Sequence, residues 1–197
     1  MNSPRLFLLA TKLEAKPILE DPNESWRADG SLKNLFHSEN DHSLLITGIG
    51  PTQTALSVGM VSSMHKEHCW TNLGIVGSLN GQLKIGDIGN ISLVSSEYES
   101  HPFDRSGDSY QIREKGWACM TVGKALHDDQ LRKNLSSKAD VVDMELYALA
   151  MASKMFKTTL ESRKIVSDFS SESDKHLIVK RIPELMASLW QKQKEQH

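Results

Sequence analysis

The sequence contains few cysteines, no long apolar run and no excess of one charge, and each absence excludes a class of protein. Its two cysteines among 197 residues, Cys69 and Cys119, exclude a disulfide framework and are expected to be reduced thiols. No stretch approaches the roughly 20 uninterrupted apolar residues that a membrane-spanning helix needs. The formal net charge of -2 provides no basic field for a nucleic-acid backbone. Neither a membrane nor a nucleic acid is therefore an expected partner.

Length and composition predict one ordinary globular domain that covers residues 1–197. The apolar fraction of 39% and the charged fraction of 24% are typical of soluble proteins, and the length suits a single core. The N-terminal segment has a short apolar run but no basic leader followed by a small-residue cleavage site. We therefore expect a cytoplasmic protein.

Short apolar runs alternate with amphipathic stretches along the chain, which predicts an α/β fold with a mostly parallel sheet. The predicted strands are Leu6–Ala10, Leu44–Thr47, Leu73–Val76, Ile88–Val94, Ala118–Val122, Val141–Val142 and Lys164–Ser167. The predicted helices are Pro51–His65, Glu145–Phe156 and Leu177–Trp190, with Pro183 as a kink or as the true start of the last one. The helix residues expected to face the sheet or the core are Ala55, Leu56, Val58, Val61, Met64, Met151 and Met155.

Two polar segments interrupt this alternation. Residues 20–41 are rich in turn-forming types and predict at most a short hairpin. Residues 95–115 are rich in Ser, Asp and Gly and predict a mobile flap near a site.

Two glycines lie between a predicted strand and a helix in TGIGPTQTA, at Gly48 and Gly50 on either side of Ile49. Backbone amides at such a helix start can face an anion or a polar oxygen, although a simple tight turn is the commoner role. The segment is not a dinucleotide-binding fingerprint, because Gln53 occupies the position of the third glycine.

Three acidic residues also follow predicted strands, where open α/β sheets place their ligands. Each has an ordinary structural alternative. Glu14 lies in the first turn of a helix and could be exposed, Glu145 could cap a helix, and Asp168 could form a turn or a cap.

The order of four segments along the chain is more specific than any one of them. The segment ATKLEAKPIL comes first, and four segments follow it in this order: ITGIGPTQTAL, NLGIVGSLNGQLKIGDI, VVDMELYALA and IVSDFS. From Leu8 to about Ser170 this arrangement resembles the purine nucleoside phosphorylase and methylthioadenosine/S-adenosylhomocysteine nucleosidase superfamily. The resemblance implies a single-domain, three-layer fold with a twisted mixed sheet flanked by helices. It also implies a purine-type nucleoside as substrate, a homo-oligomer with a dimer favoured, and neither a cofactor nor a metal ion.

The resemblance assigns catalytic roles to the three acidic residues. Asp168 would protonate N7 of the departing base, Glu145 would bind the ribose hydroxyls, and Glu14 would activate water. Met144 would lie against the sugar. The other residues expected to line the substrate site are Gly48, Ile49, Gly50, Ile75, Gly77 and Ser167.

The sequence also departs from the superfamily pattern. Ile75 stands where many relatives carry Ser, and the Gly-Ile-x-Gly wording is closer to that of futalosine hydrolases. The segment before Asp143 is shorter than in relatives, in which it supplies base-stacking aromatics. The pattern therefore leaves methylthioadenosine, adenosylhomocysteine, futalosine and simple purine nucleosides open as substrates.

The local charges favour water over phosphate as the nucleophile, because related phosphorylases bind phosphate with arginines near the first and third strands. Arg105, Arg113 or a neighbouring subunit could still complete a phosphate site, so a phosphorylase is the alternative enzyme. A nucleoside-binding protein without turnover is the non-enzymatic alternative.

Other conspicuous side chains have simpler interpretations. His65 and His68 in HKEHC are three residues apart with no second ligand pair, which favours a solvated helix end over a metal site. The tryptophans are expected to anchor the core or an interface, and they include Trp70, Trp117 and Trp190.

Overall fold

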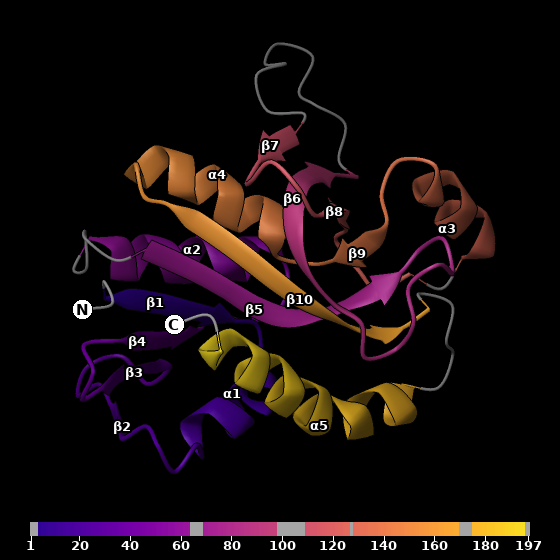
Figure 1. Ribbon diagram of the computed structural model, residues 1–197. Helices are drawn as coiled ribbons and strands as arrows, with labels where there is room; N and C mark the ends of the chain where they lie inside the picture. The colour runs from indigo at the N-terminus through magenta and orange to yellow at the C-terminus, as the bar shows by residue number, and fades with distance from the viewer. Residues whose placement is uncertain (1–3, 64–68, 98–108, 127, 170–174, 196–197) are drawn as a thin grey trace.

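The computed structural model describes residues 4–63, 69–97, 109–126, 128–169 and 175–195, which form ten strands and five helices (Figure 1). The elements up to the middle of the chain are β1 (Arg5–Leu9), α1 (Lys12–Leu19), β2 (Trp26–Ala28), β3 (Leu35–Ser38), β4 (Ser43–Ile46), α2 (Pro51–Ser62) and β5 (Cys69–Ser78). The later elements are β6 (Ile88–Ser96), β7 (Ser109–Gln111), β8 (Trp117–Thr121), α3 (Asp129–Ser136), β9 (Val141–Asp143), α4 (Leu146–Phe156), β10 (Leu160–Asp168) and α5 (Lys175–Lys194).

One mixed sheet runs through the molecule, and five of its strands close into a ring. β5 pairs with β9 and β10, β10 pairs with β6, and both β6 and β9 pair with β8. Beyond β5, the sheet continues through β1, β4, β3 and β2. β1, β4, β5 and β10 are parallel neighbours, so their carboxyl ends meet at one edge. The predicted mixed α/β fold is confirmed.

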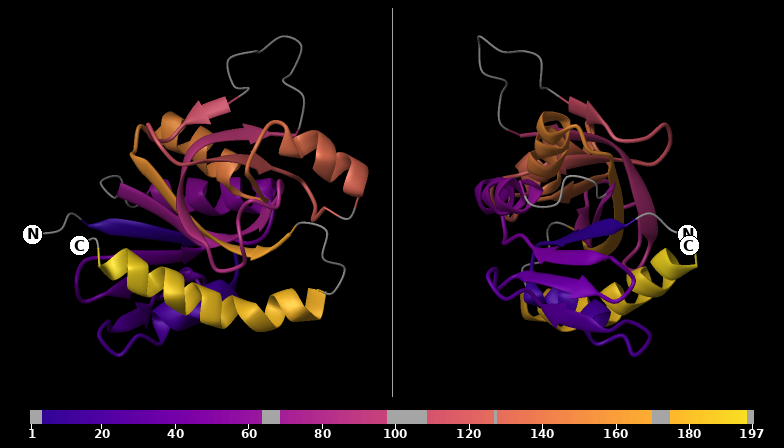
Figure 2. Two further views of the ribbon diagram at one scale, coloured as in Figure 1. Left: turned by 45° about the vertical axis from the view of Figure 1, so that its right-hand side comes forward. Right: turned by 90° about the vertical axis from the view of Figure 1, so that its left-hand side faces the viewer.

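Helices cover both faces of the sheet (Figure 1). α2 packs beside α4 on one face, and α1 packs beside α5 on the other. Strand alternation in β1 supplies both layers, because Leu6 and Leu8 join the core under α2 and α4, whereas Phe7 and Leu9 join the core under α1 and α5. Figure 2 shows α5 running along one side of the molecule, from the carboxyl end of β10 to the end where the N-terminus lies.

Two of the three tryptophans named as anchors are core residues. Trp70 is 1% exposed beneath α4, and Trp190, on the buried side of α5, is 3% exposed. Trp117 is half-buried and packs against the first of these cores.

The outward faces of α2 and α4 differ from the prediction. Val58 and Val61 of α2 are buried, but Leu56 is 66% exposed, so its expected orientation is wrong. Met151 and Met155 of α4 are also wrongly placed in the core, since they are 38% and 71% exposed. Apolar residues occur around most of each helix, so the hydrophobic pattern alone does not select the side that the sheet covers.

The connecting segments are partly as predicted. Residues 20–41 contain the β2–β3 hairpin, and the end of the predicted flap contains β7, which pairs with β6. Residues 98–108 of the flap and residues 64–68, which include Met64, His65 and His68, lie outside the described residues. Pro183 lies inside α5 and does not mark its start.

The short helix α3 was not predicted. Its N-cap residue, Asp128, accepts hydrogen bonds from the backbone amides of Gln130 and Leu131.

None of the helices in the described part of the chain combines the length and hydrophobicity that crossing a bilayer requires.

Candidate active site

A cavity of about 390 Å³ lies at the carboxyl ends of β1, β5, β9 and β10. Glu14, Glu145 and Asp168 all line it, although they come from distant parts of the sequence. Parallel pairing explains how Glu14 and Asp168 meet, because β1, which precedes α1, and β10, which contains Asp168, end at the same edge as β5. Glu145 follows β9, which pairs antiparallel with the last residues of β5. The cavity is within the usual size range of small-ligand sites, roughly 300–1,000 Å³.

Glu14 is held at the first turn of α1 and is only 4% exposed. Its Oε2 accepts hydrogen bonds from the Thr11 backbone amide at 2.8 Å and from the Thr11 hydroxyl at 2.9 Å. Its Oε1 accepts a hydrogen bond from the Ile75 backbone amide at 3.3 Å. Burial raises the pKa of Glu14, although nearby Lys164 opposes the shift. The exposed helix position considered for Glu14 is therefore wrong.

Glu145 occupies the N-cap position of α4, but its side chain does not cap the helix. Instead Asp143 accepts a hydrogen bond from the Leu146 backbone amide at 3.0 Å. The Glu145 carboxylate crosses to α2, where Oε1 accepts a hydrogen bond from the Gly50 backbone amide at 2.8 Å. Burial, followed by the negative charge of Asp143, raises the pKa of Glu145 to about 7.

Gly48 and Gly50, in the turn before α2, shape the site without lining the cavity. Gly48 and Gly50 have φ of 88° and 90°, and a side chain at Gly48 would collide with Gln53. The amide at the helix start does face an anion, but that anion is the carboxylate of Glu145. Of the three residues expected from this turn, only Ile49 lines the cavity.

Lys164 is a buried charge that the sequence reasoning missed. The side chain is 2% exposed, and its Nζ lies 3.2 Å from Asp143 Oδ2. Burial alone would lower the pKa of Lys164, but the carboxylates of Asp143, Glu145 and Glu14 outweigh it and raise the pKa. A lysine inside an apolar strand was the available signal, because an unpaired buried ammonium is very costly.

Asp143 connects Lys164 to the strands of the ring. Thr121 Oγ1 donates a hydrogen bond to Asp143 Oδ1 at 2.6 Å and accepts one from the Tyr147 backbone amide at 3.0 Å. The other oxygen of Asp143 faces Lys164. These polar contacts fix the lysine beneath the cavity, and no local sequence pattern predicted them.

Gly74 provides room for the charged groups to approach. A Cβ atom at this position would lie 3.1 Å from Glu14 Oε1 and 3.4 Å from Lys164 Nζ. The missing side chain therefore leaves the space in which the carboxylate and the ammonium lie close together.

Asp168 ends β10 beside an irregularity in the sheet. Pairing with β5 shifts register between Val166 and Asp168, so the strand bends where the side chain meets the cavity. The Ser167 hydroxyl lies 2.7 Å from Asp168 Oδ2 and 3.2 Å from the Val76 carbonyl oxygen.

The rest of the cavity surface is mostly apolar. The other residues expected to line it, Ile75, Gly77, Met144 and Ser167, do so. The segment after β8 and the first turns of α5 supply apolar walls that were not predicted, made of Val122, Ala125, Leu126, Ile178, Val179 and Ile182. Among the residues that the structure describes, no group of three His, Cys, Asp or Glu side chains could hold a metal ion.

Comparison with solved structures reveals extensive similarity to nucleosidases. A Helicobacter pylori methylthioadenosine/adenosylhomocysteine nucleosidase mutant with 5'-methylthioadenosine in its active site has a TM-score of 0.85 and 16% identity, over 99% of this chain and 98% of that one. Helicobacter pylori futalosine hydrolase gives a TM-score of 0.84 and 17% identity, with 98% and 96% covered. The Campylobacter jejuni nucleosidase gives 0.81 and 16%, with 98% and 100% covered.

The sequence matches no model of a protein family and no curated protein. The identities to the solved structures are low, so these similarities bear on the fold. The expected fold is confirmed: the chain has the same fold as these solved nucleosidases.

Proposed function

We propose that the protein is a cytoplasmic nucleosidase that hydrolyses the N-glycosidic bond of a purine-type nucleoside. The observation that carries this proposal is the convergence of Glu14, Glu145 and Asp168 on one cavity of a nucleosidase fold. Burial raises the pKa of Glu14, as a general base that works near neutral pH requires.

Each carboxyl group answers one requirement of the reaction. A purine leaves poorly as an anion, so Asp168 donates a proton to N7 while the bond to the sugar lengthens. The sugar gains oxocarbenium character, and the ionised Glu145 attracts that charge and holds the ribose hydroxyls. Glu14 orients a water molecule and removes its proton as the water attacks the anomeric carbon.

Lys164 is assigned a positioning role beneath these groups. Three buried carboxyl groups, those of Glu14, Asp143 and Glu145, act on its charge. Without a cation they would repel one another and bind protons, so Glu14 and Glu145 would lose the ionised forms that the mechanism uses. Lys164 does not line the cavity and is not assigned a contact with substrate.

Water is favoured over phosphate as the nucleophile. Among the described residues that line the cavity there is no Arg or Lys, and the amide of Gly50 is already bonded to Glu145. A phosphate dianion placed there would meet four acidic side chains and, among the described lining residues, no cation.

The decisive experiment measures release of free base from methylthioadenosine, adenosylhomocysteine, futalosine and simple purine nucleosides, with and without phosphate. We expect release from at least one of them at a rate that phosphate does not change. Strict dependence on phosphate would identify a phosphorylase instead. Saturable binding of a nucleoside with no release of base would identify the non-catalytic binding protein.

We also propose that the protein forms a homodimer through the outer faces of α2 and α4. The exposed apolar side chains gathered there are Ile49, Leu56, Met60, Met151, Met155 and Phe156. Pairs four residues apart on each helix form a stripe, and a contiguous apolar patch of this kind is typical of an interface. Ile49 also lines the cavity, so a second copy bound to this face would lie beside the site.

A further inference from the structure

The first turn of α4 is capped by two strand ends and not by its own N-cap residue. Glu145 occupies the N-cap position, but its side chain accepts no hydrogen bond from the helix. The Leu146 amide donates instead to Asp143 Oδ2 at 3.0 Å, and the Tyr147 amide donates to the Thr121 hydroxyl at 3.0 Å. Both acceptors end neighbouring strands, because Asp143 of β9 pairs with Thr121 of β8.

The Thr121 hydroxyl satisfies two buried groups at once. It accepts the hydrogen bond from the Tyr147 amide and donates its only proton to Asp143 Oδ1 at 2.6 Å. Thr121 is 1% exposed and Asp143 is 5% exposed, so solvent has little access to either contact. Thr121 itself does not line the cavity, so it acts on a bound molecule only through the residues that it holds.

This arrangement leaves the Glu145 carboxylate for the cavity. Its Oε1 accepts a hydrogen bond from the Gly50 amide at 2.8 Å. Among the described residues, none donates a hydrogen bond to Oε2. Glu145 lines the cavity, so this second oxygen is available to the ribose hydroxyls in the proposed mechanism.

Loss of the Thr121 hydroxyl would leave two buried atoms without this partner, the Tyr147 amide and Asp143 Oδ1. Such a loss is unfavourable, so another acceptor within reach of the amide is expected to replace the hydroxyl. Tyr147 is the second residue of α4, and the N-cap side chain is the usual acceptor for that amide. Rotation of Glu145 toward Tyr147 would satisfy the amide, but it would withdraw the carboxylate from Gly50 and from the cavity.

We propose that Thr121 is a positioning residue for the reaction: its hydroxyl caps α4 in place of Glu145 and thereby keeps the Glu145 carboxylate directed at the ribose. This role rests on the proposed function, in which Glu145 holds the ribose hydroxyls. It assigns to a residue outside the cavity the selection of a ribose over a sugar that lacks a hydroxyl group.

Thr121→Val tests this role, because valine keeps the branched side chain and lacks the hydroxyl. The readout is the ratio of kcat/KM for a ribonucleoside to kcat/KM for its 2'-deoxy analogue. We expect the ratio to fall roughly 10–100-fold, as for loss of a hydrogen bond to a charged group. Thr121→Ser keeps the hydroxyl and should retain most of the ratio. A fall in both rates with an unchanged ratio would indicate general damage to packing and would overturn the proposal.

Thr71→Val is the matched control. Thr71 is also 1% exposed, and its hydroxyl accepts a hydrogen bond from Arg5 Nη1 at 2.9 Å. It lies near the start of β5, whereas the cavity lies at the carboxyl end of that strand. This variant should keep the ratio of the unaltered protein, and an equal fall in both valine variants would contradict a specific role for Thr121.

A double variant shows whether Thr121 acts through Glu145. Thr121→Val combined with Glu145→Gln should lower the ratio no further than Glu145→Gln alone, because both changes remove the same contact with the sugar. Additive losses would mean that Thr121 acts through another group, and they would overturn the proposal. Thermal unfolding verifies that each variant is folded, and Thr121→Ala provides the same readouts if the valine variant does not fold.

A crystal structure of Thr121→Val tests the positioning without catalysis. We expect the Glu145 carboxylate to accept a hydrogen bond from the Tyr147 amide and to have lost the one from Gly50. A carboxylate that stays on the Gly50 amide would overturn the role of Thr121, whatever the activity of the protein. Failure of the unaltered protein to release base from any nucleoside would instead refute the proposed function, and this crystal structure would still decide whether Thr121 positions Glu145.

Discussion

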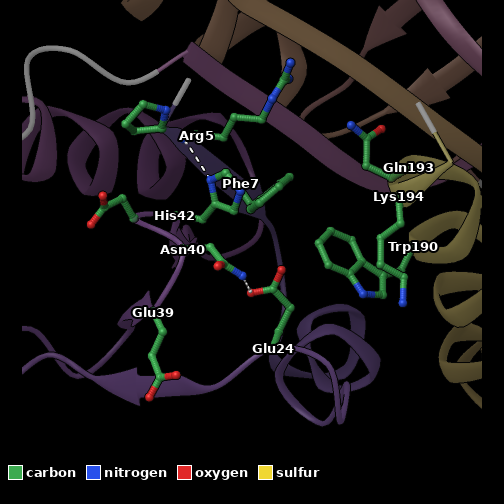
Figure 3. Close-up of a pocket in the computed structure, with 11 residues that line it drawn as sticks. Arg5, Phe7, Glu24, Glu39, Asn40, His42, Trp190, Gln193 and Lys194 are labelled. Carbon is green, nitrogen blue, oxygen red and sulfur yellow. Dashed lines mark hydrogen bonds between the residues drawn. The ribbon is translucent and has the colours of Figure 1, made fainter. Parts of the chain in front are cut away.

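The candidate active site and a second cavity of about 590 Å³ lie at opposite ends of α5 and have acidic residues in different surroundings (Figure 3). The first turns of this 20-residue helix line the candidate active site, and its last turns line the second cavity. In the first cavity, Glu14 and Glu145 are buried around Lys164, and their pKa values are raised. In the second, the acidic lining residues are Glu24, Glu39 and Asp41, and the Glu39 carboxylate lies 3.0 Å from Arg27 Nη2. Burial raises the pKa of a carboxyl group toward neutral pH and so suits it to proton transfer, whereas a solvated carboxyl group stays ionised at neutral pH.

The sharpest test of this contrast is Asp168→Asn. An amide cannot protonate the departing base, so we expect base release to fall by about 10²–10⁴-fold. The rate with the best nucleoside of the panel measures the effect. Glu39→Gln at the other end of the molecule is the control and should keep the rate of the unaltered protein. Near-normal turnover by Asp168→Asn would remove that residue from the mechanism.

The second test removes the cation from the buried cluster. Lys164→Met leaves Asp143, Glu14 and Glu145 without their positive partner, and breaking a buried ion pair in this way costs about 3–5 kcal/mol of stability. Urea denaturation at pH 8 measures the loss. It should shrink at pH 5, where the carboxyl groups take up protons, and Lys164→Arg should recover most of it. Equal stability of Lys164→Met and the unaltered protein at pH 8 would mean that the lysine does not offset these charges.

Glu145 predicts how the first cavity responds to pH. If its ionised form stabilises the sugar cation, base release should rise with pH through about 7. A pH profile of kcat/KM for the unaltered protein and Glu145→Gln measures this, and the variant should be slower and lack that rise. A variant that keeps the same midpoint would assign the titration to another group.

The same carboxyl group affects stability in a definite direction. It titrates near 4.5 in the unfolded chain and near 7 in the folded one, so the folded state holds an extra proton between these values. Its contribution to stability therefore falls as pH rises through this window and is lowest above pH 7. Denaturant unfolding across this range should show a smaller decline for Glu145→Gln.

The smallest expected effect concerns the exposed apolar face of α2 and α4 beside the first cavity. Leu56→Glu places a charge on the outer face of α2 and should shift the protein from dimer to monomer in sedimentation experiments. Its fold should be unaffected, because the side chain is 66% exposed. Leu56→Gln is the uncharged control and should weaken association less. A monomeric unaltered protein would refute the proposed dimer.

The strands around the first cavity were predictable, because each is an apolar run that is closely followed by glycines or acidic residues. Local sequence patterns also predicted that Glu14 and Asp168 meet, since parallel strands share an edge, whereas Glu145 follows β9, which is antiparallel to β5. Lys164 was missed because its role depends on Asp143 and Gly74 from other strands. These contacts arise only through pairing between segments that are distant in the sequence, so no pattern along one strand indicates them.

The prediction of helix faces failed for a different reason. Leu56 and Met155 are apolar residues on helices that also bury other apolar residues, and only packing against the sheet decides which side is covered. The second cavity was not predicted either. It combines Phe7 from β1 with Trp190 from α5, so its inner wall exists only in the assembled fold.

The capping box of α1 has a consequence for the mutational tolerance of the chain. Glu14 directs one oxygen to the amide and hydroxyl of Thr11, and the other toward Ile75 at the cavity. One side chain thus begins a helix and supplies the general base in our mechanism. Most substitutions at this position should lower abundance and turnover together, whereas Gln can still accept the amide hydrogen bond. A survey that scores Glu14 variants only by cell growth would therefore not distinguish loss of folded protein from loss of turnover.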